Sequence, residues 1–251
     1  PVLSDRRVRE ALDRLVPRDQ LMEKFGGTSA TAVSGPFLPG SAWAAPDVTP
    51  TSLDEATAAS LLEAAGFARE GNSWMREGQP LTVVLGVQSD IFDDYNDVVY
   101  ALTDGWENAG IRIKVRAIRP TAWRDVVEAG RAAEEYDLIL GRWNVDREES
   151  TLDLFVSRGD EQQSVNIFAY DSERVDGAVQ AFYNEASGPE REAIMRGLHA
   201  RLHDDRPYLF LWSLRVNSVY RHDRLAGVRP ARFYYYTDAD GWRWREDAAG
   251  P

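Results

Sequence analysis

Between residues 81 and 140 the hydrophobic pattern alternates between strand and helix, and this alternation constrains the fold more than any other feature. Residues 81–87 form a continuous apolar run, residues 91–106 carry apolar side chains every three or four positions, and residues 111–117 alternate apolar with basic side chains. Residues 121–133 return to helical spacing, and residues 136–140 are again apolar. Because strands joined by helices pair in parallel through right-handed crossovers, the pattern predicts an α/β domain with a parallel sheet.

Start and stop signals place further elements around this unit. We expect helices at 5–16, 52–65, 172–186 and 187–205, and a strand at 207–214. Ser52 and Glu55 have the spacing of a capping box at the start of the second helix. Residues 28–50 lack periodicity, and residues 217–251 are aromatic and arginine-rich without helical spacing. These signals predict one α/β domain followed by an irregular tail.

Charge and residue content exclude several classes of function. The chain has 29 Lys and Arg against 41 Asp and Glu, a net charge of −12, and this disfavours a nucleic-acid partner because phosphate binding needs a clustered basic face. The chain has no cysteine, so it has no disulfides, thiolate nucleophiles or cysteine zinc sites. Neither Lys24 nor Lys114 follows a glycine-rich phosphate loop, and no cofactor is expected.

His199 and His203 have the one spacing that suggests a metal site, because residues i and i+4 share a helical face. A zinc-protease motif also needs glutamate directly after the first histidine, and this position is Ala200. We therefore expect no metal site and predict that the two imidazoles lie at a solvated helix end, beside Asp204 and Asp205.

The strongest candidate for a binding site is the stretch 141–149, which follows the last strand of the predicted sheet. Open α/β sheets bind ligands at the carboxyl ends of their strands. Trp143 offers a flat apolar wall, and Asp146 offers a fixed negative charge for an ammonium group. The alternative, which the residues leave open, places Trp143 in the core and uses Asp146 to cap the loop.

Seven segments occur in a recognisable order along nearly the whole chain: 5–12, 35–39, 58–67, 106–111, 136–146 with its Arg-Trp-x-x-Asp, 166–176 and 203–208. In order and spacing they resemble the C-terminal half of the family-5 extracellular solute-binding proteins. These are the dipeptide-, oligopeptide- and nickel-binding components of ABC importers.

The resemblance implies a periplasmic-binding-protein-like fold of type II, in which two lobes close on a ligand. Residues 1–214 would form the C-terminal lobe, an α/β unit with a parallel or mixed sheet flanked by helices. Residues 215–251 would be a tail that crosses back towards an N-terminal lobe absent from this sequence. We therefore expect the chain, which opens inside a helical pattern, to be part of a longer protein.

The resemblance also assigns residues to the cleft. In peptide-binding members the acid at the position of Asp146 holds the α-amino group of the ligand, and Trp143 lines the cleft. The remaining residues assigned to this cleft are Arg142, Asn144, Asn166 and Tyr170. The sequence departs from the peptide-binding pattern after Asp146, where Arg147 adds positive charge that suits a carboxylate or another anion.

The resemblance implies a non-catalytic, periplasmic or extracellular protein, exported free or lipid-anchored, that captures a peptide-like solute for ABC permease subunits. Two other classes remain open. One is a hydrolase that uses the carboxylates of the acidic loop 146–149. The other is an interaction module built on the aromatic stretches 233–236 and 242–244. Surface left uncovered by the absent lobe is the preferred interpretation of these aromatics.

Overall fold

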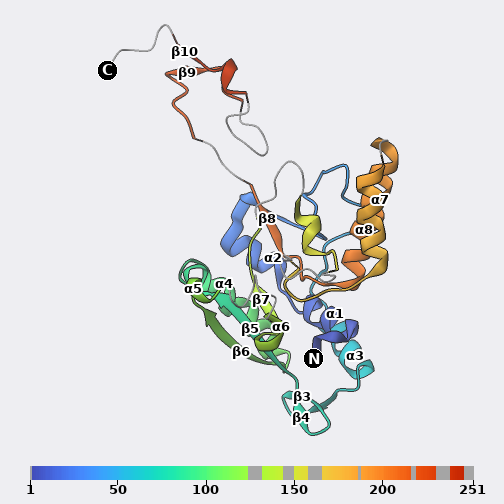
Figure 1. Ribbon diagram of the computed structural model, residues 1–251. Helices are drawn as coiled ribbons and strands as arrows, with labels where there is room; N and C mark the ends of the chain where they lie inside the picture. Colours follow the sequence, from blue (N-terminus) through green and yellow to red (C-terminus); the bar gives the residue numbers. More distant parts are fainter. Residues whose placement is uncertain are drawn as a thin grey trace.

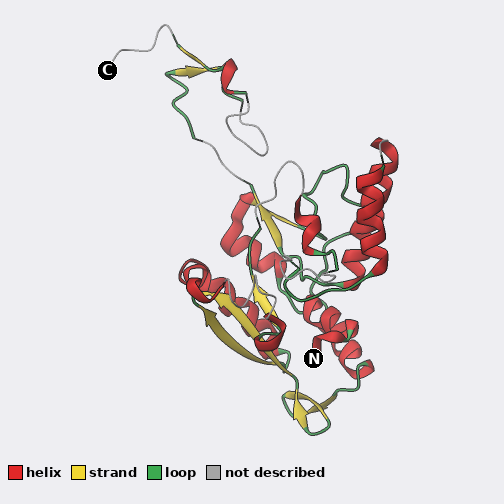
Figure 2. Cartoon of the chain, viewed as in Figure 1, coloured by secondary structure: helices red, strands yellow, loops and turns green. Residues whose placement is uncertain are grey.

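The computed structural model describes residues 2–123, 132–143, 150–157, 166–185, 188–215, 219–229 and 238–245 (Figures 1 and 2). Its α-helices in these ranges are α1 (Arg6–Arg14), α2 (Arg18–Leu21), α3 (Glu55–Ala64), α4 (Ser89–Asn108), α5 (Pro120–Trp123), α6 (Ala132–Glu135), α7 (Glu173–Asn184) and α8 (Gly188–Asp205). Its strands are β1 (Ala30–Ala32), β2 (Ala68–Glu70), β3 (Ser73–Arg76), β4 (Gln79–Pro80), β5 (Thr82–Gln88), β6 (Arg112–Ile118), β7 (Leu138–Leu140), β8 (Trp212–Leu214), β9 (Leu225–Ala226) and β10 (Arg243–Trp244). The predicted α/β class is confirmed.

Three of these strands form the parallel sheet that the sequence predicts, in the order β6-β5-β7. In register, Leu85 of β5 lies between Val115 of β6 and Leu138 of β7. The central strand is mostly buried, whereas Val115 on the neighbouring strand is 40% exposed. The apolar side of β6 is therefore partly in solvent, because this strand forms an edge of the sheet.

Helices cover both faces of the sheet. Leu85 belongs to a hydrophobic cluster that also contains Leu102 of α4 and Leu12 of α1. Its neighbour Val84 points the other way and packs against a cluster that contains Tyr136. Burial on both faces explains why β5 has a continuous apolar run rather than an alternating one.

A third hydrophobic cluster lies where α7 and α8 run side by side (Figure 1). Phe182 of α7 and Leu198 of α8 are buried there together with Phe37, which comes from the irregular segment after β1. An edge-to-face ring contact joins Trp43 of the same segment to Phe182, with centroids 5.2 Å apart. The segment is thus part of the core of this region.

The start of α3 corrects the predicted capping box. The N-cap is Asp54 rather than Ser52: its carboxylate accepts hydrogen bonds from the Thr57 amide at 2.9 Å and the Thr57 hydroxyl at 2.6 Å. These hydrogen bonds lower the pKa of Asp54. A carboxylate also interacts favourably with the positive end of the helix dipole, so Asp54 is the better cap.

The strand predicted at 207–214 is too long. Only β8, its last three residues, is a strand, and it pairs antiparallel with β1. Before β8, Arg206 has a positive φ of 49°, and the main-chain carbonyl of Phe210 accepts a hydrogen bond from Arg18 instead of a neighbouring strand. The sequence gives no periodic signal for β1, which is only three residues long.

The strands β9 and β10 pair with each other and lie apart from the rest of the described chain (Figure 1). Their surroundings leave apolar side chains in solvent: Val219 is 97% exposed and Trp244 is 71% exposed. Within the described residues, none of the helices combines the length and the apolar character that crossing a membrane requires.

Candidate functional site

The loop after β7 carries two of the predicted site residues into solvent. Arg142 and Trp143 follow the carboxyl end of this parallel strand, and Trp143 is 48% exposed. The alternative that places Trp143 in the core is therefore wrong. A half-exposed indole at this end of a parallel sheet is well placed to contact a bound molecule. Asn144 and Asp146 lie outside the described residues, as do the other carboxylates of the acidic loop 146–149.

Asn166 is placed differently from what its assignment to the cleft suggests. Its side chain is 2% exposed, and its amide group donates to the main-chain carbonyls of Val156 (2.9 Å) and Tyr170 (2.7 Å). Its amide oxygen accepts the main-chain N–H of Tyr170 at 3.0 Å. The bonds to Tyr170 close the turn 166–170, and the bond to Val156 ties this turn to the segment 150–157.

Tyr170, held by this turn, is bonded to the end of α8. Its hydroxyl donates to the carboxylate of Asp205 at 2.7 Å. Burial, and then the hydrogen bond to Asp205, raises the pKa of Tyr170 to about 12. The ring is partly buried, and the hydroxyl serves as a fixed donor to the carboxylate over the physiological pH range.

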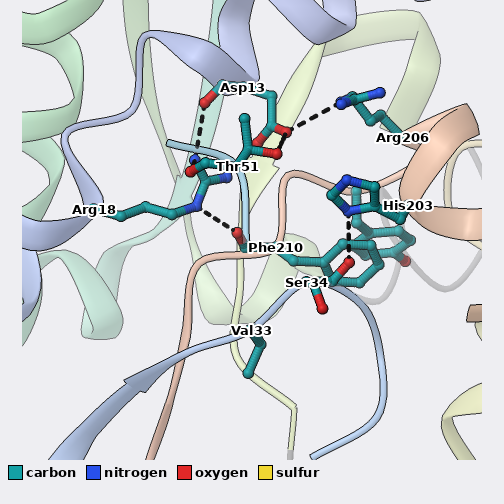
Figure 3. Close-up of a pocket in the computed structure, with 9 residues that line it drawn as sticks. Asp13, Arg18, Val33, Ser34, Thr51, His203, Arg206 and Phe210 are labelled. Carbon is teal, nitrogen blue, oxygen red and sulfur yellow. Dashed lines mark hydrogen bonds and ion pairs between the residues drawn. The ribbon is translucent and has the colours of Figure 1, made fainter. Parts of the chain in front are cut away.

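A polar cavity lies between α1, the segment after β1 and the residues that follow α8 (Figure 3). At its centre Asp13 pairs with both Arg18 and Arg206, and all three residues are at least nine-tenths buried. The Nε atom of Arg206 lies 3.1 Å from Oδ2 of Asp13, and the Thr51 hydroxyl donates to the same oxygen at 2.6 Å. Further donors of Arg18 reach the main-chain carbonyls of Phe210, Asp13 and Thr51.

The cavity is too small and too well paired to be a solute site. Its volume of about 10 Å³ has space for at most one water molecule. Asp13 pairs with Arg18 and Arg206, and Glu10 lies 3.6 Å from Arg206 as a second negative charge. The remaining donors bond to the polypeptide, so the cluster joins three distant segments of the fold. Sequence reasoning missed this cluster because Arg206 is 193 positions from Asp13 and no local pattern relates them.

His199 is buried and both histidines are hydrogen-bonded to the segment after β1, which corrects the prediction of a solvated helix end. His199 is 1% exposed, and its Nδ1 accepts the main-chain N–H of Ala45 at 2.8 Å while its Nε2 lies 3.1 Å from the Ser34 hydroxyl. His203 donates from Nδ1 to the carbonyl of Ser34 at 2.9 Å. Both imidazoles therefore fasten the segment after β1 to α8. Within the described part of the chain, no group of three or more His, Cys, Asp or Glu is placed to hold a metal ion.

The most recognisable motif of the sequence, 5–12, also has a structural role here. Arg9 on α1 donates to the main-chain carbonyls of Asp205, the last residue of α8, and of Arg206, which follows it. It also donates to those of Leu3 and Ser4. A guanidinium satisfies carbonyls that a helix end leaves unpaired. Arg9 of this motif thus joins α1 to the end of α8, and the motif gives no direct information about a ligand.

A parallel sheet with helices on both faces and an exposed loop at its carboxyl end is the arrangement of the type II periplasmic binding proteins. Residues 1–163 match the model of the bacterial extracellular solute-binding proteins, family 5 (middle region). The match covers more than half of the chain, and the chain belongs to this family.

Solved structures agree with this fold. The oligopeptide-binding protein AppA of Bacillus subtilis, solved with a nonapeptide, has a TM-score of 0.75 and 16% identity over 97% of this chain and 48% of its own. NikZ of Campylobacter jejuni, solved with Ni(L-His), has a TM-score of 0.74 and 21% identity over 96% of this chain and 49% of its own. The oligopeptide-binding protein of Thermus thermophilus, solved with a pentapeptide, has a TM-score of 0.74 and 16% identity over 84% of this chain and 38% of its own.

The chain thus spans about half of the length of these structures, or less. A comparison with curated proteins found no match.

Proposed function

We propose that this chain is the C-terminal lobe of the substrate-binding component of an ABC importer, and that it captures a peptide-like solute between two lobes without catalysis. In this proposal residues 1–214 form the lobe, and residues 215–251 cross back to the N-terminal lobe. The partners are that lobe and the permease subunits of the importer. The protein works in the periplasm or outside the cell, free or held by a lipid anchor.

The observation that carries the proposal is the position of Trp143 in a chain of this family. It is a large aromatic side chain, half in solvent, three residues beyond the carboxyl end of a strand in a parallel sheet. Arg142 beside it is exposed as well. Two of the similar structures contain peptides, and one contains a nickel–histidine complex, so solutes with both amino and carboxylate groups fit this family.

The proposed site divides the work among its residues by charge and shape. Asp146 holds an ammonium group, Arg142 holds a carboxylate or another anion, and Trp143 packs against the apolar part of the solute. Asn144 supplies an amide in the same loop. The turn closed by Asn166 and bearing Tyr170 supports the wall of the cleft, which is the role that its hydrogen bonds favour.

Calorimetry with peptides on the two-lobed protein tests this proposal. We expect Asp146→Asn to weaken peptide binding by about 2–4 kcal/mol, because the ligand's buried ammonium group loses its partner. Asp153→Asn is the matched control, since Asp153 is an exposed acid close in sequence and its neutralisation leaves affinity unchanged. Unchanged peptide affinity in Asp146→Asn would refute the role of this carboxylate.

The present chain alone provides a second test. Half of a cleft lacks the contacts made on closure, so this chain is expected to bind the same peptides at least about a hundredfold more weakly than the two-lobed protein. Equally tight binding by this chain would contradict the two-lobe mechanism.

A further inference from the structure

A buried imidazole on α8 contacts the segment 33–48 near both of its ends. The ring of His199 lies between Ser34 and Ala45, which are near the two ends of this segment, and bonds to both of them. The ring also makes an edge-to-face contact with Phe37, with centroids 5.7 Å apart. Gly35 lies so close that a Cβ atom added there would approach the ring carbon Cδ2 to 2.3 Å. The segment is therefore fitted to this side chain.

The hydrogen bonds fix the protonation state of His199. The main-chain N–H of Ala45 can only donate, so Nδ1 of the imidazole must be unprotonated. The hydroxyl of Ser34 donates its single hydrogen to the carbonyl of Val48 at 2.9 Å. Its oxygen is then free to accept from Nε2 of His199, which carries the proton. Only the neutral ring with the proton on Nε2 satisfies all of these contacts.

Protonation of His199 would oppose its hydrogen bond with the main chain of Ala45. A second proton on Nδ1 of His199 would face the N–H of Ala45, so that two donors meet at a distance of 2.8 Å in a buried place. Burial lowers the pKa of His199 below its ordinary value of 6.5, and the nearby His203 lowers it further. The neutral ring is therefore the folded form, and the stability that it contributes is present above pH 6.5 and lost as the pH falls below that value.

Few charged groups lie around this ring. On α8 they are Arg196, which donates to the carbonyl of Ala42 at 2.9 Å, and His203, whereas the segment itself carries the exposed Asp47. The facing part of α7 contributes apolar side chains to the shared cluster. The charges of the cavity cluster, Asp13, Arg18 and Arg206, lie near His203 and Ser34 and are paired with one another (Figure 3). No carboxylate bonds to the ring among the described residues. A main-chain hydrogen bond at Ser34 favours the imidazolium, but burial outweighs it and the pKa of His199 stays below its ordinary value.

We infer that His199 is an acid-sensitive latch, and that its protonation releases the segment 33–48 from α8 while the parallel sheet stays folded. The release would expose Phe37, which is 2% exposed in the latched form, together with the neighbouring Trp43. This device operates within the described lobe and is independent of which solute the protein binds.

Amide hydrogen exchange of the whole chain, followed by NMR between pH 8 and pH 5, tests the latch. After correction for the intrinsic exchange rate, we expect the protection of the Ala45 amide to fall about tenfold for each pH unit below 6.5, until the lowered pKa of the latched His199 is reached. The amide of Leu85 in β5 is the internal reference and keeps its protection. The nitrogen chemical shifts of the His199 ring should change from the Nε2-protonated tautomer to the imidazolium over the same pH range.

Two variants separate this latch from a general effect of acid. His199→Asn keeps a short polar side chain that does not titrate, so the extra loss of Ala45 protection at low pH should disappear. His203→Asn removes the neighbouring imidazole, and the extra loss of Ala45 protection at low pH should remain in this variant. A pH-independent Ala45 protection in the unchanged chain, an equal loss at Leu85, or a loss abolished by His203→Asn would each overturn the inference.

Discussion

Asp13 on α1 and Arg206 directly after α8 form a buried ion pair, with 3.1 Å between Oδ2 and Nε, although 193 positions separate them in the sequence. Arg18 pairs with the other carboxylate oxygen, so that one negative charge serves two buried guanidinium groups. The pair joins the first helix of the chain to the segment that leads into β8. The structure therefore depends on contacts between segments that are far apart in the sequence.

Removal of this carboxylate should be severely destabilising. We expect Asp13→Ala to lower the free energy of unfolding by about 3–5 kcal/mol, because two buried cations lose their shared partner. Chemical denaturation at pH 7 measures the change. Asp19→Ala is the matched control, since Asp19 is an exposed acid on α2 and its loss should change stability by less than about 0.5 kcal/mol. Similar values for both variants would contradict the importance of the buried pair.

Gly35 should not tolerate a side chain. In Gly35→Ala the new Cβ would meet ring atoms of His199 at 2.3 and 2.4 Å. We expect this overpacking to lower the free energy of unfolding by about 1–3 kcal/mol. Thermal denaturation followed by circular dichroism measures it. Gly177→Ala in the middle of α7 is the control: a Cβ there meets nothing within 4 Å, so this variant should gain about 0.5–1 kcal/mol from helix propensity. Equal effects of the two substitutions would show that the close approach to His199 has no energetic consequence.

Alkaline pH should weaken the turn that carries Tyr170. Its pKa is raised to about 12 by burial and by the hydrogen bond to Asp205, so the protonated phenol stabilises the folded state fully below pH 10. This contribution is lost as the pH rises from 10 to about 12. Burial also raises the pKa of Tyr208, and this residue adds to the same trend. Urea denaturation at a series of pH values should therefore show a steeper loss of stability for the parent chain than for Tyr170→Phe.

The control for this experiment is Tyr183→Phe. Tyr183 is on α7 with 61% of its side chain exposed, and its variant should follow the pH dependence of the parent chain. Tyr170→Phe should also lose about 0.5–1.5 kcal/mol at neutral pH, from the missing hydrogen bond to Asp205. An unchanged alkaline slope in Tyr170→Phe would show that other groups cause the trend.

Trp143 should affect solute binding without affecting stability. In the two-lobed protein we expect Trp143→Ala to weaken peptide affinity by about 1–3 kcal/mol, through lost apolar contact with the solute. Because the side chain is half exposed, unfolding of the present chain should change little. Calorimetry and denaturation measure the two quantities separately. Tyr183→Ala, an exposed aromatic far along the chain, should leave affinity as it is, and a peptide affinity insensitive to Trp143→Ala would remove this residue from the proposed site.

The sequence predicts the central part of the fold well because local rules apply there. The period of the apolar residues identifies β5, α4, β6 and β7, and the handedness of crossovers makes the sheet parallel. The resemblance likewise rests on motifs such as 5–12 and 35–39. In the structure Arg9 and Gly35 of these motifs hold helices and a loop together, so the motifs report the fold more directly than the ligand.

Local sequence patterns predict the candidate site less well than they predict the fold. The resemblance assigned Asn166 and Tyr170 to the cleft without a role for either, and the structure shows that Asn166 is buried and that its amide closes a turn. Burial of a polar residue depends on which carbonyls surround it, and spacing in the sequence carries no such information. The half-exposed Trp143 is the opposite case, because strand and loop order alone put it at the carboxyl end of β7.

By itself, the sequence determined the α/β class, the parallel order of the sheet and the family of this protein, since each follows from local periodicity or from motifs in order. Only the tertiary structure decided which partners the buried charged and polar residues have. Asp13 forms ion pairs with Arg18 and Arg206, and the neutral imidazole of His199 forms hydrogen bonds with Ser34 and Ala45. The physical reason is that burial makes a polar group depend on its partner. Arg206 is 193 positions from Asp13, and Ser34 and Ala45 are 165 and 154 positions from His199, so no local pattern relates them.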